Sequence, residues 1–240
     1  MRRAAKLSIA GGVALVVLLG GGYALLSARS SNAPAPATLE APASTAPPAT
    51  STQSDGATQS GAGLDGTWRV RADGASFVGY RVREQLTFLS APNEAVGRTT
   101  AVTGTLRIAG ERVEAARIQA DLRELASDES RRDNAIRGRG LESESFPMAT
   151  FGLTAPIELP AAPARGQQVT AEGSGRLSVH GVTRAVTLPL QGRWDGDTIQ
   201  MAARLPVRMS DYGIQPPRFG PVVSIEDSAT IELRLVFEPA

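Results

Sequence analysis

The chain has 240 residues, a formal net charge of +1 and no cysteine. Without cysteine it forms no disulfide and has no thiolate nucleophile, no Cys-ligated zinc and no cysteine for a lipoprotein anchor. The small basic excess lies in the leading segment, so the rest of the chain is nearly neutral. Nucleic-acid binding requires a basic surface, and we therefore expect no nucleic-acid partner.

The first predicted element is an apolar run, Leu7–Leu26, which carries no charged residue. As a helix it would extend about 30 Å, the thickness of a bilayer core. Arg2, Arg3 and Lys6 precede the run, and this bias keeps the N-terminus in the cytoplasm. We expect residues 1–29 to form a single-pass anchor in the cell membrane, with the rest of the chain outside.

A cleaved signal peptide is the alternative for residues 1–29. Small residues at the offsets that a signal peptidase uses occur only around Ser31 and Ala33, and Pro34 beside that bond would obstruct cleavage. The apolar run is also long for a signal peptide. Cleavage would instead release a secreted or periplasmic protein.

Residues 30–64 are rich in Pro, Ala, Ser and Thr and have almost no large apolar side chains. This composition predicts a disordered, partly extended linker whose role is spacing.

Residues 65–240 have the mixed composition of one globular domain, and apolar residues alternate with polar ones in several runs separated by Gly, Pro, Asn and Asp. Val102–Ile108 and Ala229–Phe237 are two such runs. Two-faced strands joined by turns predict an all-β fold, an antiparallel sheet closed into a barrel or folded into a sandwich. The charged stretch that follows Ser127 lacks this alternation, and we expect a short helix over residues 128–137.

Groups for catalysis or metal binding are sparse. His180 is the single histidine and falls in a predicted hairpin turn, where we expect a structural role rather than a catalytic one. The acidic pairs Glu142/Glu144 and Asp195/Asp197 lack the spacing of a calcium loop. The sequence therefore predicts no enzyme, no catalytic residue, no metal site and no cofactor.

Several motifs in order along the domain resemble the YceI-like polyisoprenoid-binding family. They are Gly66–Trp68, Arg132–Asp133, Phe146–Pro147, the hairpin Gly175–Arg184 (GRLSVHGVTR) and Asp211–Ile214. The resemblance spans the domain from its first strand to its last. It implies an extended, lipocalin-like antiparallel β-barrel of about eight strands that holds an isoprenoid chain in its lumen, in proteins that are usually exported.

The resemblance implies that one face of each strand lines the lumen. The expected ligand-binding residues are Val78, Tyr80, Val82, Leu106, Ile108, Phe151, Leu177, Met201, Leu205, Ile231 and Leu233. The alternative is that such side chains fill a small barrel completely. Tyr80 and Glu84 stand where family members often have Phe and His, so the mouth of the cavity is expected to differ from theirs.

Arg132 and Arg137 are the candidate contacts for a ligand head group, because they belong to the densest basic stretch. They would meet a pyrophosphate or the anionic membrane surface. Acidic residues such as Asp128 lie among them, so a solvated, salt-bridged helix is the alternative.

Together these features predict an extracytoplasmic protein that holds an isoprenoid-type apolar lipid, for example a quinone-like one, in a barrel lumen. Each buried methylene contributes roughly 0.8 kcal/mol, so such a ligand needs no catalytic group to bind. The alternative is a ligandless barrel that acts as an exported scaffold for protein interactions, with a partner that the sequence does not identify.

Overall fold

The computed structural model describes residues 33–40, 63–88, 91–159, 163–218 and 220–240. By its internal contacts the chain divides into Met1–Pro34 and Ala35–Ala240, and every element below belongs to the second unit. The predicted anchor and most of the predicted linker lie outside the described residues. Among the described residues, no helix is long and apolar enough to cross a bilayer.

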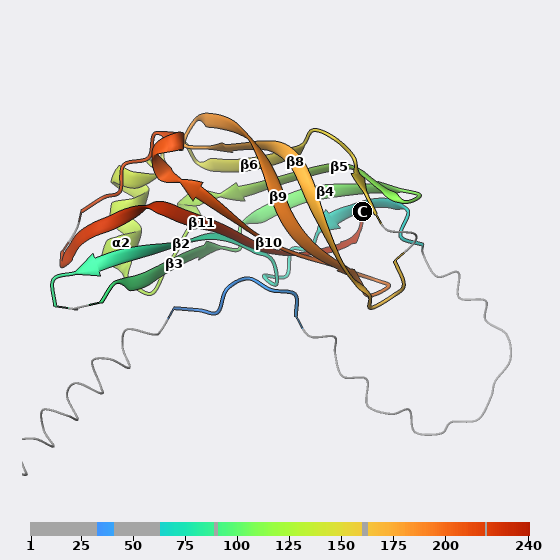
Figure 1. The fold of residues 1–240 in the computed structure, drawn as a ribbon, viewed down its shortest axis with the longest axis horizontal. Helices are drawn as coiled ribbons and strands as arrows, with labels where there is room; N and C mark the ends of the chain where they lie inside the picture. The colour runs from blue at the N-terminus through green and yellow to red at the C-terminus, as the bar shows by residue number, and fades with distance from the viewer. Residues whose placement is uncertain (1–32, 41–62, 89–90, 160–162, 219) are drawn as a thin grey trace, which may run out of the picture. The chain divides into compact units, whose positions relative to one another are not determined.

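The second unit is built almost entirely of antiparallel strands (Figure 1). They are β1 Gly66–Val70, β2 Phe77–Leu86, β3 Asn93–Thr99, β4 Val102–Ala109, β5 Arg112–Asp121, β6 Met148–Leu153, β7 Ile157–Glu158, β8 Gln168–Val179, β9 Val182–Trp194, β10 Ile199–Arg208 and β11 Val222–Pro239. The helical pieces are the 3₁₀ turns η1 Leu122–Glu124 and η3 Met209–Tyr212, the α-helix α2 Ser130–Ala135 and the π-turn η2 Ile136–Gly140.

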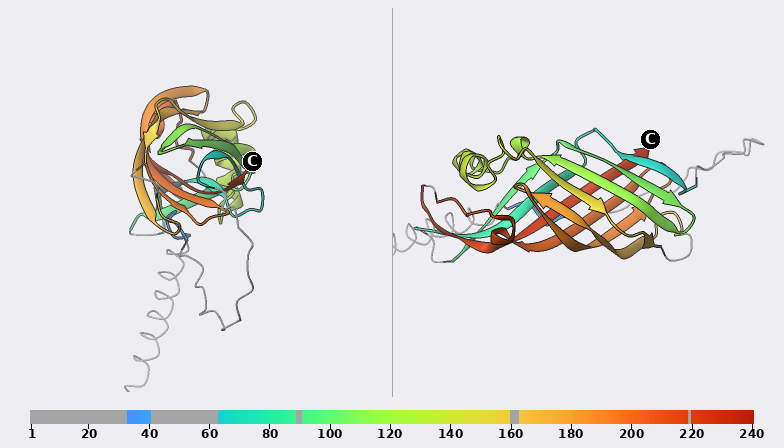
Figure 2. Two further views of the ribbon diagram at one scale, coloured as in Figure 1. Left: turned by 90° about the vertical axis from the view of Figure 1, so that its right-hand side faces the viewer. Right: turned by 90° about the horizontal axis from the view of Figure 1, so that it is seen from above.

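Eight strands close into a barrel in the order β1, β4, β5, β6, β8, β9, β10 and β11, and β1 then pairs with β11. Figure 2 shows this ring end on. The all-β barrel with one short helix, predicted from alternation and resemblance, is confirmed. Each of these strands has a paired neighbour on both sides over part of its length, and closed barrels avoid edge-to-edge aggregation in this way.

The long strand β11 is shared between two partners. Its last residues, Phe237–Pro239, pair with β1, whereas Val222–Arg234 pair with β2. β2 continues into β3, and Arg98 of β3 bonds through both backbone groups to Ala126, at 2.8 and 3.0 Å. The β2–β3 hairpin therefore extends the wall of the barrel beyond the end of β1.

Helix α2 lies at the end of the barrel that this hairpin extends (Figure 1). Its N-cap is Glu129, whose side chain accepts a hydrogen bond from the backbone N–H of Arg131. The helix lies within the predicted range of residues 128–137 but is shorter, because the chain passes at Ile136 into a π-turn that contains two glycines.

Candidate functional site: an apolar cavity in the barrel

Strand β11 shows how alternation positions the inner wall. Ile231 and Leu233 face the barrel interior and line a cavity. Glu232 and Arg234, on the opposite face of the same strand, form ion pairs on the outer wall. Because side chains alternate along every strand, the interior is built from one residue in two.

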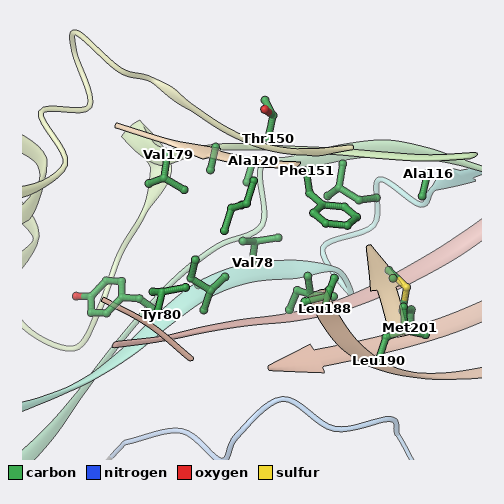
Figure 3. Close-up of a pocket in the computed structure, with 18 of the residues that line it drawn as sticks. Val78, Tyr80, Ala116, Ala120, Thr150, Phe151, Val179, Leu188, Leu190 and Met201 are labelled. Carbon is green, nitrogen blue, oxygen red and sulfur yellow. The ribbon is translucent and has the colours of Figure 1, made fainter. Parts of the chain in front are cut away.

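The cavity has a volume of about 250 Å³. Its wall is made almost entirely of apolar side chains from both sides of the barrel, as Figure 3 shows for Val78, Leu188, Leu190 and Met201. Apolar cavities of this kind stay free of ordered water and accept apolar guests.

The structure places ten of the eleven predicted lumen residues in the cavity wall. They are Val78, Tyr80, Val82, Leu106, Ile108, Phe151, Leu177, Met201, Ile231 and Leu233. Leu205 is the exception, because it packs against the buried clusters around Leu233 and Leu177 and does not border the open space.

Part of the interior is filled rather than open. Trp68, Leu235 and Phe237 are buried in the main core cluster and lie outside the cavity lining. Phe237 belongs to the short section where β11 pairs with β1, and Trp68 also lies in that section. A filled core and a cavity were alternatives from sequence, and the barrel has both.

Two aromatic rings reach across the inner wall because a glycine lies opposite each of them. A Cβ atom on Gly97 would come within 2.4 Å of the Tyr80 ring, and one on Gly175 would come equally close to the Phe151 ring. Any other residue at either position would displace the ring. Glycine within a strand often marks such a close approach, and this signal was available in the sequence.

Loop residues that sequence alternation missed also line the cavity. Leu141 follows the π-turn, and Ile214, Pro216 and Pro217 come from the connection between η3 and β11. Loop residues show no hydrophobic periodicity, so the sequence pattern could not predict that they face the interior.

The phenol of Tyr80 is the unusual polar group at the cavity. Its hydroxyl oxygen is buried and has no hydrogen-bond partner among the described residues. Burial raises the pKa of the Tyr80 phenol well above its ordinary value of 10.0, so the group stays neutral. It is therefore a hydrogen-bond donor without an acceptor.

Arg132 and Arg137, the predicted head-group contacts, do not border the cavity. The Arg132 guanidinium is bound by Glu84 at 2.8 Å and by Asp128 at 2.5 Å. Arg137 donates to the carbonyl of Leu125. Arg132 is therefore salt-bridged, as in the alternative interpretation, but it is buried rather than solvated, and its pairing with Glu84 joins α2 to β2.

His180 lies in the two-residue turn between β8 and β9 and has a positive φ of 52°. Its Nδ1 lies 3.1 Å from the carbonyl oxygen of Tyr212 and donates to it, and its ring meets Phe146 edge to face at 4.7 Å. These contacts fit the predicted structural role. Within the described ranges, no three acidic or histidine residues gather in a group that could bind a metal ion.

Comparison with known proteins shows that the chain matches one protein family and is similar in fold to several solved structures. A model of the YceI-like domain matches residues 68–237. A polyisoprenoid-binding domain from Saccharophagus degradans, implicated in plant cell wall breakdown, has a TM-score of 0.58 and 18% identity, covering 72% of this chain and 98% of its own. BcnA from Burkholderia cenocepacia has a TM-score of 0.53 and 20% identity, covering 70% and 98%. No curated protein sequence matches the chain.

Proposed function

The chain belongs to the YceI-like family, and on that premise we propose that it holds an isoprenoid-type lipid inside its barrel. The family resemblance found in the sequence is thereby confirmed, whereas the ligand is the proposal. The observation that carries it is the cavity, which lies inside the closed barrel and is lined almost wholly by apolar side chains of strands and loops.

The energetics favour a long, flexible hydrocarbon as the guest. Roughly 0.8 kcal/mol is gained for each methylene moved from water to an apolar wall, so a few isoprene units suffice for tight binding. A polar ligand would gain little, because the wall offers it few hydrogen-bonding groups. The solved Saccharophagus degradans domain is described as polyisoprenoid-binding, and its similar fold supports the same ligand class here.

The place of action is part of the proposal. Leu7–Leu26 lies outside the described residues, and its length and flanking basic residues support a membrane anchor with the barrel on the outer side. An anchored barrel would take up or deliver lipid beside the bilayer. Cleavage of the segment would release the same barrel to the periplasm or the medium.

The absence of catalysis also stays a prediction. The single histidine is engaged in a turn, and we propose binding rather than chemistry as the activity. Apart from the lipid, we propose no cofactor and no nucleic-acid partner.

Two neighbouring alanines on β5 provide the test. Ala116 borders the cavity, whereas the next residue towards the N-terminus, Ala115, is exposed on the outer wall. Both variants place a large ring on the same strand, but Ala116→Trp places it in the lumen. We expect Ala116→Trp to lower binding of a fluorescent polyprenyl probe at least tenfold and Ala115→Trp to leave it unchanged.

Native mass spectrometry and lipid extraction of the purified chain should identify the natural ligand as a bound isoprenoid or quinone. If both variants bind the probe as the parent does, the lumen is not the binding site. A parent chain that carries no lipid and takes up no probe would instead favour the protein-interaction scaffold.

A further inference from the structure

The outer wall of the barrel contains side chains that are as buried as the core. Outward-facing residues of a barrel normally meet solvent, as Arg204 does on β10. Two residues away on the same face, Ala202 is 3% exposed, and Glu232, the partner of Arg204 on β11, is wholly buried. Burial on this face requires that something covers it.

The cover is a segment of the chain's own predicted linker, Ala35–Glu40. The N–H of Ala37 donates to Oε2 of Glu232 at 3.2 Å, and Ala37 itself is 5% exposed. Arg98 donates to the carbonyl of Ala35 at 2.6 Å. The segment is therefore bound by its backbone as well as by side-chain packing.

The far end of the segment is held by two arginines. Arg193 donates to the carbonyl of Glu40 at 2.6 Å, and Arg234 pairs with the carboxylate of Glu40 at 2.8 Å. The contacts run from Arg98 on β3 across β11 to Arg193 on β9, so the segment crosses several strands of the wall.

The groups under the segment are held in place by one another. Glu232 also binds Arg98 at 2.7 Å and lies 3.5 Å from Arg81. The guanidinium groups of Arg98 and Arg234 lie 4.1 and 5.3 Å from the centre of the Phe77 ring. Stacking of this kind orients the planar cations and leaves their N–H groups free to hold carbonyl oxygens.

The segment has the composition that such a surface favours. It reads APATLE, and Ala37 is small enough for its backbone to approach Glu232. Pro36 restricts the unbound chain to extended conformations, which lowers the entropy lost on docking. Covalent connection to the barrel also keeps the effective concentration of the segment high, roughly in the millimolar range.

We propose that the outer wall around Glu232 is a binding site for an extended, alanine- and proline-containing peptide, and that Ala35–Glu40 is its resident ligand. The linker is then divided by the docked segment. Where the chain is anchored as proposed above, docking shortens the tether: covalent geometry allows about 28 Å across residues 27–34 but about 130 Å across residues 27–64. Docking thus keeps the barrel close to the bilayer.

The test measures docking directly in the full chain in detergent or nanodiscs. The chain has no cysteine, so Thr38→Cys and Arg204→Cys introduce a unique pair for spin labels. Both positions are exposed, and Arg204 lies opposite Glu232 in the strand register. Electron–electron distance measurements should give one short, narrow distance for this labelled parent.

Two proline variants distinguish the loss of a docking contact from a general stiffening of the segment backbone. Ala37→Pro removes the N–H that donates to Glu232, whereas Ala35→Pro stiffens the backbone but keeps the carbonyl that accepts from Arg98. Loss of a hydrogen bond to a charged group should lower the ratio of docked to undocked molecules roughly tenfold to hundredfold. We expect Ala37→Pro to broaden the distance distribution and Ala35→Pro to retain it.

A broad distribution in the labelled parent, or an Ala37→Pro variant as narrow as the parent, would overturn the proposal. The labels report docking whether or not lipid is bound and whether or not the N-terminal segment spans a membrane. Failure here would therefore leave the proposed lipid function untouched.

Discussion

Around Glu232 and Leu233, both faces of β11 are buried, but for different reasons. On the inner face, Leu233 borders a cavity left open by its neighbours. On the outer face, Glu232 lies under the backbone of Ala37 and between two arginines, with its side chain wholly buried. The inner face of β11 is therefore apolar and borders open space, whereas its outer face at Glu232 is charged and covered by the Ala37 backbone. Burial of a side chain therefore does not by itself show whether that face of the barrel borders a ligand cavity or a docked segment.

The largest predicted effect tests the charged face. Glu232→Ala removes the acceptor for Arg98 and for the Ala37 N–H and leaves buried cationic groups with less compensation. Breaking a buried ion pair from one side typically costs about 3–5 kcal/mol. We expect a loss of that size in the free energy of unfolding, measured by urea denaturation.

Glu238→Ala on the same strand is the matched control. Glu238 pairs with Arg69 at 2.9 Å, but both side chains are partly exposed to solvent. Exposed pairs contribute about 0–1 kcal/mol, so this variant should unfold almost as the parent does. Equal losses in the two variants would show that the segment does not shield Glu232 from water.

Sequence reasoning predicted the inner face far better than the outer one. Alternation is a local signal, and together with the family resemblance it was sufficient to predict the barrel and to place residues such as Val78 and Ile231 in its lining. It could not show that Leu205 would pack away from the open space, because that depends on neighbours from other strands. Nor does it carry any sign that a distant segment binds Glu232.

A second prediction compares the filled and the open regions of the inner face. Leu235 and Leu233 are two residues apart on the same side of β11, but Leu235 is fully buried in packed core and Leu233 borders the cavity. Truncating a leucine costs more where the surroundings are tightly packed. We expect Leu235→Ala to destabilise the barrel by about 4 kcal/mol and Leu233→Ala by about 2 kcal/mol.

Urea denaturation of both leucine variants in lipid-free protein checks this difference. Lipid must be removed first, since a bound guest fills the space beside Leu233 and stabilises the folded state. A larger loss for Leu233→Ala than for Leu235→Ala would contradict the assignment of open and filled regions.

A third prediction concerns the polar group at the inner wall. The Tyr80 hydroxyl is buried with no partner in the described part of the chain, and an unsatisfied buried donor costs about 1–3 kcal/mol. Tyr80→Phe removes the hydroxyl and keeps the ring over Gly97. In lipid-free protein we expect this variant to gain about 1 kcal/mol in unfolding free energy. A loss of stability would mean that the hydroxyl has a partner.

The smallest effect is expected at a solvent-exposed carboxylate of β11, in contrast to Glu232. Asp227 accepts hydrogen bonds from the hydroxyl and the N–H of Ser210, at 2.7 and 2.8 Å, and these hold the pKa of Asp227 below its ordinary 3.8. A lowered folded-state pKa stabilises the protein above the unfolded-state pKa, and this contribution disappears as the pH falls through the folded-state value.

Asp227→Asn should therefore destabilise the barrel slightly at pH 7, and the gap between parent and variant should narrow as the pH falls below about 4. A double-mutant cycle with Ser210→Ala, measured by urea denaturation across this range, isolates the hydrogen bond between the Ser210 hydroxyl and the Asp227 carboxylate. A coupling that stays constant from pH 7 to pH 2 would show that the Asp227 charge does not contribute. Because this carboxylate faces water, its effect must remain far below that of Glu232, which is wholly buried and pairs with Arg98 and Arg81.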